Sequence, residues 1–201
     1  MHRVFISYHH ANDQYYKEEL LRWNRANPIF HDYSVDTGDI PDHWSDETIR
    51  QEIRDEYLRD STVTILLVGT ETKRRKHIDW ELYSSMYDGT KNKRSGILVI
   101  NLPSTGCTYF DSAHNGEKDA IYPECTSWTT ITERSEYERR YPCMPDRIID
   151  NLLEPSVKIS VTNWSKIESD WNKLRFLIEV AHNDKSSCDY DLSTRMRRAN
   201  S

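Results

Sequence analysis

The sequence has few cysteines, no long apolar run and no excess of positive charge. Its four cysteines form no C-x-x-C pair and no spacing typical of a metal site, so we expect free thiols. No stretch approaches the roughly 20 apolar residues that a membrane helix needs. A net charge of -6 argues against a nucleic-acid binder, which normally presents a basic face. The first residues, M-H-R-V-F-I-S-Y, do not resemble a signal peptide. We therefore expect a cytoplasmic protein without membrane or nucleic-acid partners.

The most informative segment of the sequence covers residues 63–86. It begins with the apolar run V-T-I-L-L-V, continues through a basic loop and ends in an amphipathic stretch that carries Glu81. A strand buried on both faces of a parallel sheet has such a continuous apolar run. In open α/β sheets, ligands bind beyond the carboxyl ends of the strands. Glu81 is therefore a carboxylate placed where chemistry can occur.

Strands and helices alternate along the rest of the chain. Short apolar runs predict strands over residues 4–8, 28–33, 63–68, 95–101 and 157–161. Helical spacing predicts helices over 13–24 and 165–181, the first capped by Asn12 or Asp13, and a further helix that begins at Ser45. This alternation favours an α/β, flavodoxin-like, five-stranded parallel sheet with the order 2-1-3-4-5.

The length is compatible with a single domain, which we assign to residues 1–183. Residues 103–155 form a long irregular insertion before the last strand, with two short helices predicted near 133–139 and 146–153. Two roles are open for this insertion: a cover over the ligand-binding edge of the sheet, or a surface for a partner. The polar residues 184–201 are predicted to be a flexible tail.

Helical geometry places Glu81 at the edge of the buried side of its helix. At about 100° per residue, the buried stripe consists of Ile78, Leu82 and Met86, and Trp80 points away from it. Glu81 then lies about 60° from Ile78 and is half-sheltered. The alternative is a solvated glutamate that stabilises the start of the helix.

Several segments resemble Toll/interleukin-1 receptor (TIR) domains. The first strand, V-F-I-S-Y, a second strand that ends at Asp32, a polar loop with Gly38 and the W-E-L motif around Glu81 occur in the order found in that family. More narrowly, the chain resembles the bacterial TIR-like proteins of the Thoeris anti-phage defence type. The resemblance covers roughly the first half of the chain and, more loosely, residues 163–181.

The resemblance implies an enzyme that cleaves the nicotinamide–ribose bond of NAD, often with formation of a cyclic ADP-ribose-type signalling nucleotide. By family position Glu81 is the catalytic glutamate, and NAD is a substrate, with no separate cofactor. The residues expected to bind NAD are Ser7, Tyr8, His9, His10, Asp36, Gly38, Trp44 and His77. His77 departs from the family, which often has tryptophan at this position, so the substrate preference is open. The resemblance also implies a downstream effector reached through the nucleotide product, and activation by a phage component or by assembly into a homo-oligomer or filament.

Each of these residues also has a simpler interpretation. The histidines after the first strand could be merely exposed, Gly38 could serve a turn, and Trp44 could be a packing residue. We expect no metal at His9 and His10, because no third ligand is spaced near them. For the whole chain, the alternative is a non-catalytic TIR adaptor that acts through protein contacts. A phosphoacceptor receiver is disfavoured, because S-Y-H and G-T follow the first and third strands where that class needs acidic residues.

Overall fold

The computed structural model describes residues 1–34, 43–58, 60–90 and 93–200. Its five strands are β1 (His2–Ser7), β2 (Phe30–Asp32), β3 (Val63–Val68), β4 (Gly96–Asn101) and β5 (Ser160–Asn163). They are parallel and ordered β2-β1-β3-β4-β5, which confirms the predicted flavodoxin-like α/β fold. The helices are α1 (His10–Ala26), α2 (Asp46–Glu52), α3 (Lys76–Met86), α4 (Glu117–Ile121), α5 (Arg134–Arg140), α6 (Asp146–Leu152), α7 (Trp164–Ser169) and α8 (Trp171–Asp184).

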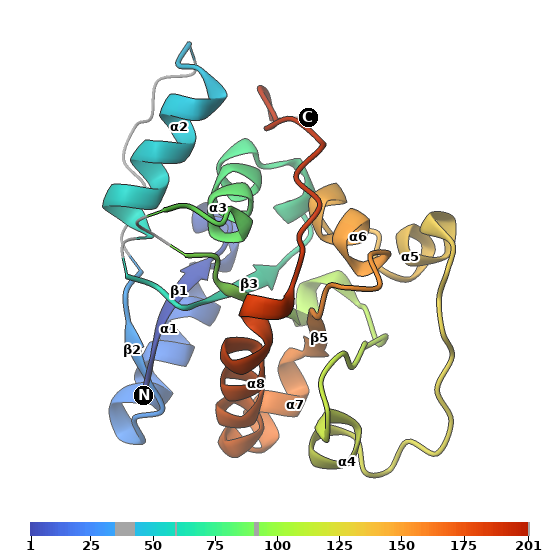
Figure 1. Ribbon diagram of the computed structural model, residues 1–201. Helices are drawn as coiled ribbons and strands as arrows, with labels where there is room; N and C mark the ends of the chain where they lie inside the picture. Colours follow the sequence, from blue (N-terminus) through green and yellow to red (C-terminus); the bar gives the residue numbers. More distant parts are fainter. Residues whose placement is uncertain (35–42, 59, 91–92, 201) are drawn as a thin grey trace.

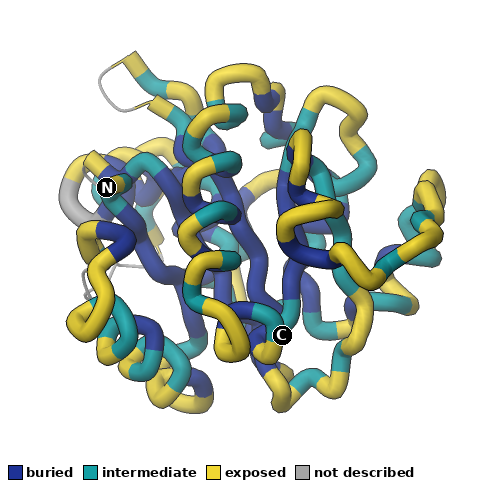
Figure 2. Tube along the Cα trace, turned by 90° about the horizontal axis from the view of Figure 1, so that it is seen from below, coloured by how far each residue is buried: buried dark blue, intermediate teal, exposed yellow. Residues whose placement is uncertain are grey.

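Helices cover both faces of the sheet, giving three layers (Figure 1). On one face, Leu20 of α1 and Leu174 of α8 pack against alternate strand residues such as Ile6 and Ile65. On the other face, α3 and α6 pack against the intervening strand residues. All residues of β3 and β4 are buried, and Figure 2 shows the strands as a dark-blue interior between partly exposed helices. A strand covered on both faces gains stability only from apolar side chains in both directions, which explains the continuous runs.

Two helix boundaries differ from the sequence prediction. Helix α1 begins at His10, so Asp13 lies inside its first turn and does not cap it. The helix predicted over 165–181 is divided into α7 and α8, because Asp170 has an extended backbone and its side chain caps α8 by accepting from the Asn172 N–H. The predicted cap at Ser45 is confirmed, since its hydroxyl accepts from the Thr48 N–H at 3.1 Å.

The insertion of residues 103–155 packs around the β5 edge of the sheet, and its helix α6 covers part of one face. Asp111 forms an antiparallel bridge to Val161 of β5, with N–H to carbonyl distances of 2.8 and 2.9 Å. Glu117 of α4 is buried and accepts from the Ser160 hydroxyl at 2.8 Å. The two predicted short helices are present as α5 and α6. The insertion is therefore an integral layer at the β5 edge.

Residues 188–200, which we call the C-terminal strap, are packed against the domain. The expectation of a flexible tail is wrong for this segment: Cys188, Tyr190 and Met196 are buried, with exposed fractions of 1%, 8% and 3%. Asn151 of α6 pairs with the backbone of Asp191 through two hydrogen bonds of 2.8 and 3.1 Å. Figure 1 shows this segment running from α8 past α3 and α6 towards α2. The composition of the strap is polar, but its few apolar residues supply anchors that local sequence does not identify.

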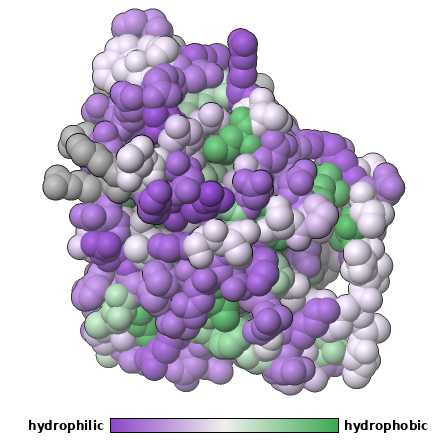
Figure 3. Space-filling view, in the orientation of Figure 1, coloured by the Kyte–Doolittle hydropathy of each residue, from purple (hydrophilic) through white to green (hydrophobic). Residues whose placement is uncertain are grey.

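The surface is largely hydrophilic. Figure 3 shows small, separate hydrophobic patches on one face. None of the helices in the described part of the chain combines the length and apolar character that crossing a membrane requires. The four cysteines are free thiols.

Candidate active site

Glu81 meets Ser7 at the carboxyl edge of the sheet. Ser7 is the last residue of β1, and its hydroxyl donates to Glu81 Oε2 at 2.6 Å. Both side chains are buried, with exposed fractions of 1% and 4%. Strands β1 and β3 are neighbours, so α3, which follows β3, brings Glu81 over the end of β1. A hydrogen bond to an ionised carboxylate is short and strong, and it fixes the carboxylate in one orientation.

Glu81 is more deeply buried than helix geometry alone predicts. One turn later, Ser85 hydrogen bonds to Thr64 of β3 at 2.8 Å, so the two polar side chains of this helix face join the strands. The opposite side of α3 is covered as well: Trp80 has no exposed surface and packs against Met196 of the strap. Trp80 does point away from the stripe of Ile78, Leu82 and Met86, as predicted, but a second buried cluster encloses it on that side. A helix covered on both sides shelters the residues on its flanks too.

Tyr8 lies on the other face of the sheet from Ser7. Successive strand residues alternate between faces, and Tyr8 packs in the core cluster on the α1 side. Its hydroxyl donates to Gln14 Oε1 at 2.6 Å, and its ring stacks on His10 with a centroid distance of 4.4 Å. The Lys17 ammonium lies 5.1 Å from the Tyr8 ring centroid. Tyr8 and His10 thus form a pair on the α1 side, separate from the Ser7–Glu81 pair.

His9 directly precedes α1 and is half-buried. Burial lowers the pKa of His9, and the nearby positive charge of Arg75 lowers this pKa further. A lowered pKa favours a neutral imidazole, which can accept or donate a hydrogen bond without an added charge. His9 thus interacts electrostatically with Arg75, which directly precedes the helix that carries Glu81.

His77 and Trp44 both contact the Trp80 cluster. The His77 ring lies 4.9 Å from the Trp80 ring, at an angle of 60°. Trp44 is half-buried and packs against the cluster formed by Phe5, Trp80 and their neighbours. This position agrees with a packing role for Trp44. Asp36 and Gly38 lie outside the described residues.

The basic run before α3 is largely engaged with acidic neighbours. Lys73 lies 3.2 Å from Asp146, and Arg74 and Arg75 both pair with Glu71, at 3.8 and 3.4 Å. Among the described residues, no three His, Cys, Asp or Glu side chains are grouped so that they could hold a metal ion.

Asp13 is a buried carboxylate at the same edge of the sheet. The sequence indicated only a possible helix cap at this position. Asp13 is 2% exposed, and its Oδ2 has no hydrogen-bond partner in the described part of the chain. A Cβ added to Gly69, which follows β3, would lie 2.3 Å from Asp13 Oδ2, so glycine allows the carboxylate to sit over the strand end. Burial raises the pKa of Asp13 to about 6. The sequence signal that could have found it is the glycine directly after a buried strand.

Asp13→Asn is expected to stabilise the protein at neutral pH. The folded state holds the Asp13 proton up to a pH of about 6, whereas the unfolded chain releases it near the ordinary pKa of 3.8. Stability of the wild type therefore falls as pH rises through this window. Each pKa unit corresponds to about 1.4 kcal/mol, so the gain in Asp13→Asn is near zero at pH 4 and reaches up to about 3 kcal/mol above pH 7. Thermal unfolding between pH 4 and 8 measures the difference.

The control for this prediction is Asp189→Asn, because Asp189 is exposed. This control should show no such pH-dependent gain. An Asp13→Asn variant whose melting temperature follows the wild type at every pH would contradict the assigned pKa.

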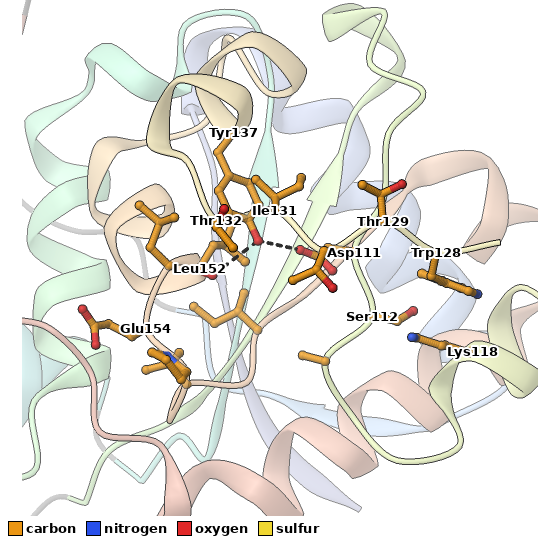
Figure 4. Close-up of a pocket in the computed structure, with 16 residues that line it drawn as sticks. Asp111, Ser112, Lys118, Trp128, Thr129, Ile131, Thr132, Tyr137, Leu152 and Glu154 are labelled. Atoms are coloured by element: carbon orange, nitrogen blue, oxygen red, sulfur yellow. Dashed lines mark hydrogen bonds between the residues drawn. The ribbon is translucent and has the colours of Figure 1, made fainter.

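A cavity of about 440 Å³ lies within the insertion, beyond β5 (Figure 4). Tyr137 donates from its hydroxyl to Asp111 Oδ2 at 3.1 Å and to the Leu152 carbonyl at 3.3 Å. Burial raises the pKa of the Asp111 carboxyl. The strands β3, β4 and β5 are consecutive in the sheet, so the cavity is separated from the Ser7–Glu81 pair by β4 and β5. This polar hollow is distinct from the candidate active site.

Comparison with known proteins identifies the family. A search of curated proteins finds no match. The family model described as Thoeris protein ThsB, TIR-like domain, matches residues 5–106. This range begins in β1, contains both Ser7 and Glu81, and ends after β4. The cavity of the insertion lies outside it. The match spans half of the chain and agrees with the observed strand order, and the protein therefore belongs to the family of Thoeris ThsB proteins with a TIR-like domain.

Proposed function

We propose that this protein cleaves the bond between nicotinamide and ribose in NAD, with Glu81 as the catalytic residue. The observation that carries the proposal is the buried Glu81 carboxylate, held by Ser7 at the carboxyl edge of a parallel sheet. Ligands of open α/β sheets bind at this edge. Family membership in a defence system supports the same assignment.

The chemistry needs only one carboxylate. Glycoside hydrolysis usually requires an acid that protonates the leaving group and a second carboxylate. The nicotinamide of NAD is already cationic, so it leaves with the electron pair of the broken C–N bond as a neutral molecule. The ribose carbon becomes an oxocarbenium ion, which the negative charge of Glu81 stabilises. A buried setting strengthens this attraction, because the effective dielectric constant is lower than in water.

The fate of the ribosyl cation decides the product. Attack by water, followed by loss of a proton, gives ADP-ribose. Attack by a nitrogen of the adenine in the same molecule gives a cyclic ADP-ribose-type nucleotide. We propose the cyclic nucleotide as the product, acting on a downstream effector, with assembly into a homo-oligomer or filament as a route to activation.

The test is to incubate the purified protein with NAD and to measure free nicotinamide, with mass spectrometry of the second product. The assay is repeated with lysate from phage-infected cells, because the enzyme can require a trigger. Release of nicotinamide that depends on Glu81 supports the proposal. If neither condition yields nicotinamide, the adaptor interpretation replaces it.

Ser7→Ala is expected to lower kcat by about tenfold while the KM for NAD changes little. The hydroxyl fixes the orientation of Glu81, and a hydrogen bond to a charged group contributes about 1.5 to 3 kcal/mol. Steady-state kinetics measures both constants. The matched control is Ser84→Ala on α3, the helix that carries Glu81, because the Ser84 hydroxyl is buried and has no hydrogen-bond partner among the described residues. Equal activity of the two variants would show that Ser7 does not position the carboxylate.

A further inference from the structure

The strap forms three hydrogen bonds with the first two turns of α3. The N–H of Lys76, the first residue of the helix, donates to Asn200 Oδ1 at 3.0 Å. The N–H of Arg197 donates to Asp79 Oδ2 at 2.8 Å, and the Trp80 indole N–H donates to the Arg197 carbonyl at 2.7 Å. The first N–H groups of a helix have no partners within it, and the residue before α3 provides no side-chain cap. The end of the chain therefore supplies this cap.

Met196 anchors the strap in the core. It is 3% exposed and belongs to a cluster with Phe5 of β1, Ile49 of α2 and Trp80 of α3. Met196 therefore belongs to a cluster that joins three elements: β1, which carries Ser7, α3, which carries Glu81, and α2. Removing a buried methionine side chain typically costs about 2 to 5 kcal/mol. The anchor is therefore strong enough to determine the path of the strap.

Arg147 of α6 fixes the strap and α3 together. Its guanidinium makes a bidentate ion pair with Asp79, with distances of 2.8 and 3.1 Å. It also donates to the carbonyls of Thr194 and Arg195, at 3.1 and 3.3 Å. Such a planar, multiply bonded arrangement restricts geometry more than a single contact can. Asp79, two residues before Glu81, therefore binds both the strap, through the Arg197 N–H, and α6, through Arg147.

These contacts bear directly on where Glu81 lies. An α-helix turns by about 100° and rises 1.5 Å per residue. A small rotation or slide of α3 would therefore change the 2.6 Å contact between Glu81 and Ser7. A misplacement of about 1 Å can reduce catalysis a hundredfold. The groups held by the strap belong to residues 76, 79 and 80, the last of which directly precedes Glu81.

We propose that the C-terminal strap is a positioning element for the catalytic helix, and that Met196 is its main positioning residue. The strap holds the first two turns of α3 against α2 and α6, and this sets the orientation of Glu81. The kinetic part of this inference rests on the proposed cleavage of NAD, whereas its structural part does not.

Met196→Ala tests the inference by kinetics. We expect kcat to fall by about tenfold or more, with the KM for NAD unchanged within about twofold, because the carboxylate moves while other substrate contacts remain. Met196→Leu, which preserves volume and apolar character, is expected to retain the wild-type kcat. The matched control is Arg195→Ala, because the Arg195 side chain is exposed and adjacent in the strap. If Met196→Ala retains kcat within twofold, the inference is wrong.

Hydrogen exchange gives a second readout that does not need activity. In Met196→Ala, the amides at the start of α3 should lose protection while those of β3 and β4 keep theirs. Asn200→Ala, which leaves the core untouched, should lose protection at the first turn of α3 only. If protection is lost equally throughout the sheet, the strap contributes only to the overall stability of the domain, and the proposal is wrong. If the wild type does not cleave NAD, the proposed function fails, and unchanged protection of α3 in Met196→Ala would then separately reject the positioning role.

Discussion

Glu81→Gln is expected to lower nicotinamide release from NAD by about a hundred- to a thousandfold without loss of the fold. Glutamine has nearly the same shape, and its oxygen still accepts from the Ser7 hydroxyl, which lies 2.6 Å from Glu81 Oε2 in the wild type. The change removes the negative charge that stabilises the oxocarbenium ion, and loss of one preorganised electrostatic group typically costs this factor. Chromatographic measurement of nicotinamide gives the rate, and circular dichroism confirms folding.

Two further variants sharpen the result for Glu81. Glu81→Asp keeps the charge but is one methylene shorter, so it should retain part of the charge stabilisation and lose the contact with Ser7. Glu168→Gln removes an exposed carboxylate and should behave as the wild type. If folded Glu81→Gln releases nicotinamide as fast as the wild type, the assignment of Glu81 is wrong.

Arg147→Ala is expected to destabilise the protein by about 3 to 5 kcal/mol. The Arg147 side chain is 1% exposed and Asp79 is 13% exposed. Removing one partner of a buried ion pair leaves the other charge uncompensated, which has a cost of this size. The melting temperature of a domain of this length should fall by about 6 to 20 °C. Thermal and urea unfolding measure the change.

The double variant Arg147→Ala with Asp79→Ala separates the pair from its surroundings. Because the unpaired charge is then absent, the double variant should be less destabilised than the sum of the single variants. Arg139→Ala, which removes an exposed ion pair with Glu136, should change stability by less than about 1 kcal/mol. A loss of under 1 kcal/mol in Arg147→Ala would show that this pair does not hold the strap.

The strands and the catalytic candidate could be predicted because their signals are local. Strands β3 and β4 are continuous apolar runs, and the structure places them within one residue of the predicted bounds. The first strand and the segment around Glu81 carried the resemblance that the family match over residues 5–106 confirms. In each case the deciding residues lie within a few positions of one another.

The environment of those residues could not be predicted in the same way. The sequence suggested that Tyr8 and Ser7 share a site, but alternation in β1 places their side chains on opposite faces of the sheet. Trp80 looked like a residue outside the buried stripe because nothing near it indicates the strap that covers it. The burial of Asp13 depends on Gly69, more than fifty residues away.

The sequence by itself determined the sheet, its strand order and the position of a glutamate after the third strand, because apolar patterning and local motifs encode these features. Only the tertiary structure decided that Glu81 is bound to Ser7, that its helix is covered on both sides, and that the end of the chain caps it. The Trp80–Arg197 and Lys76–Asn200 contacts join residues 117 and 124 positions apart. Such pairs leave no periodic signal in the chain, since their contact arises only when the packed layers bring them together.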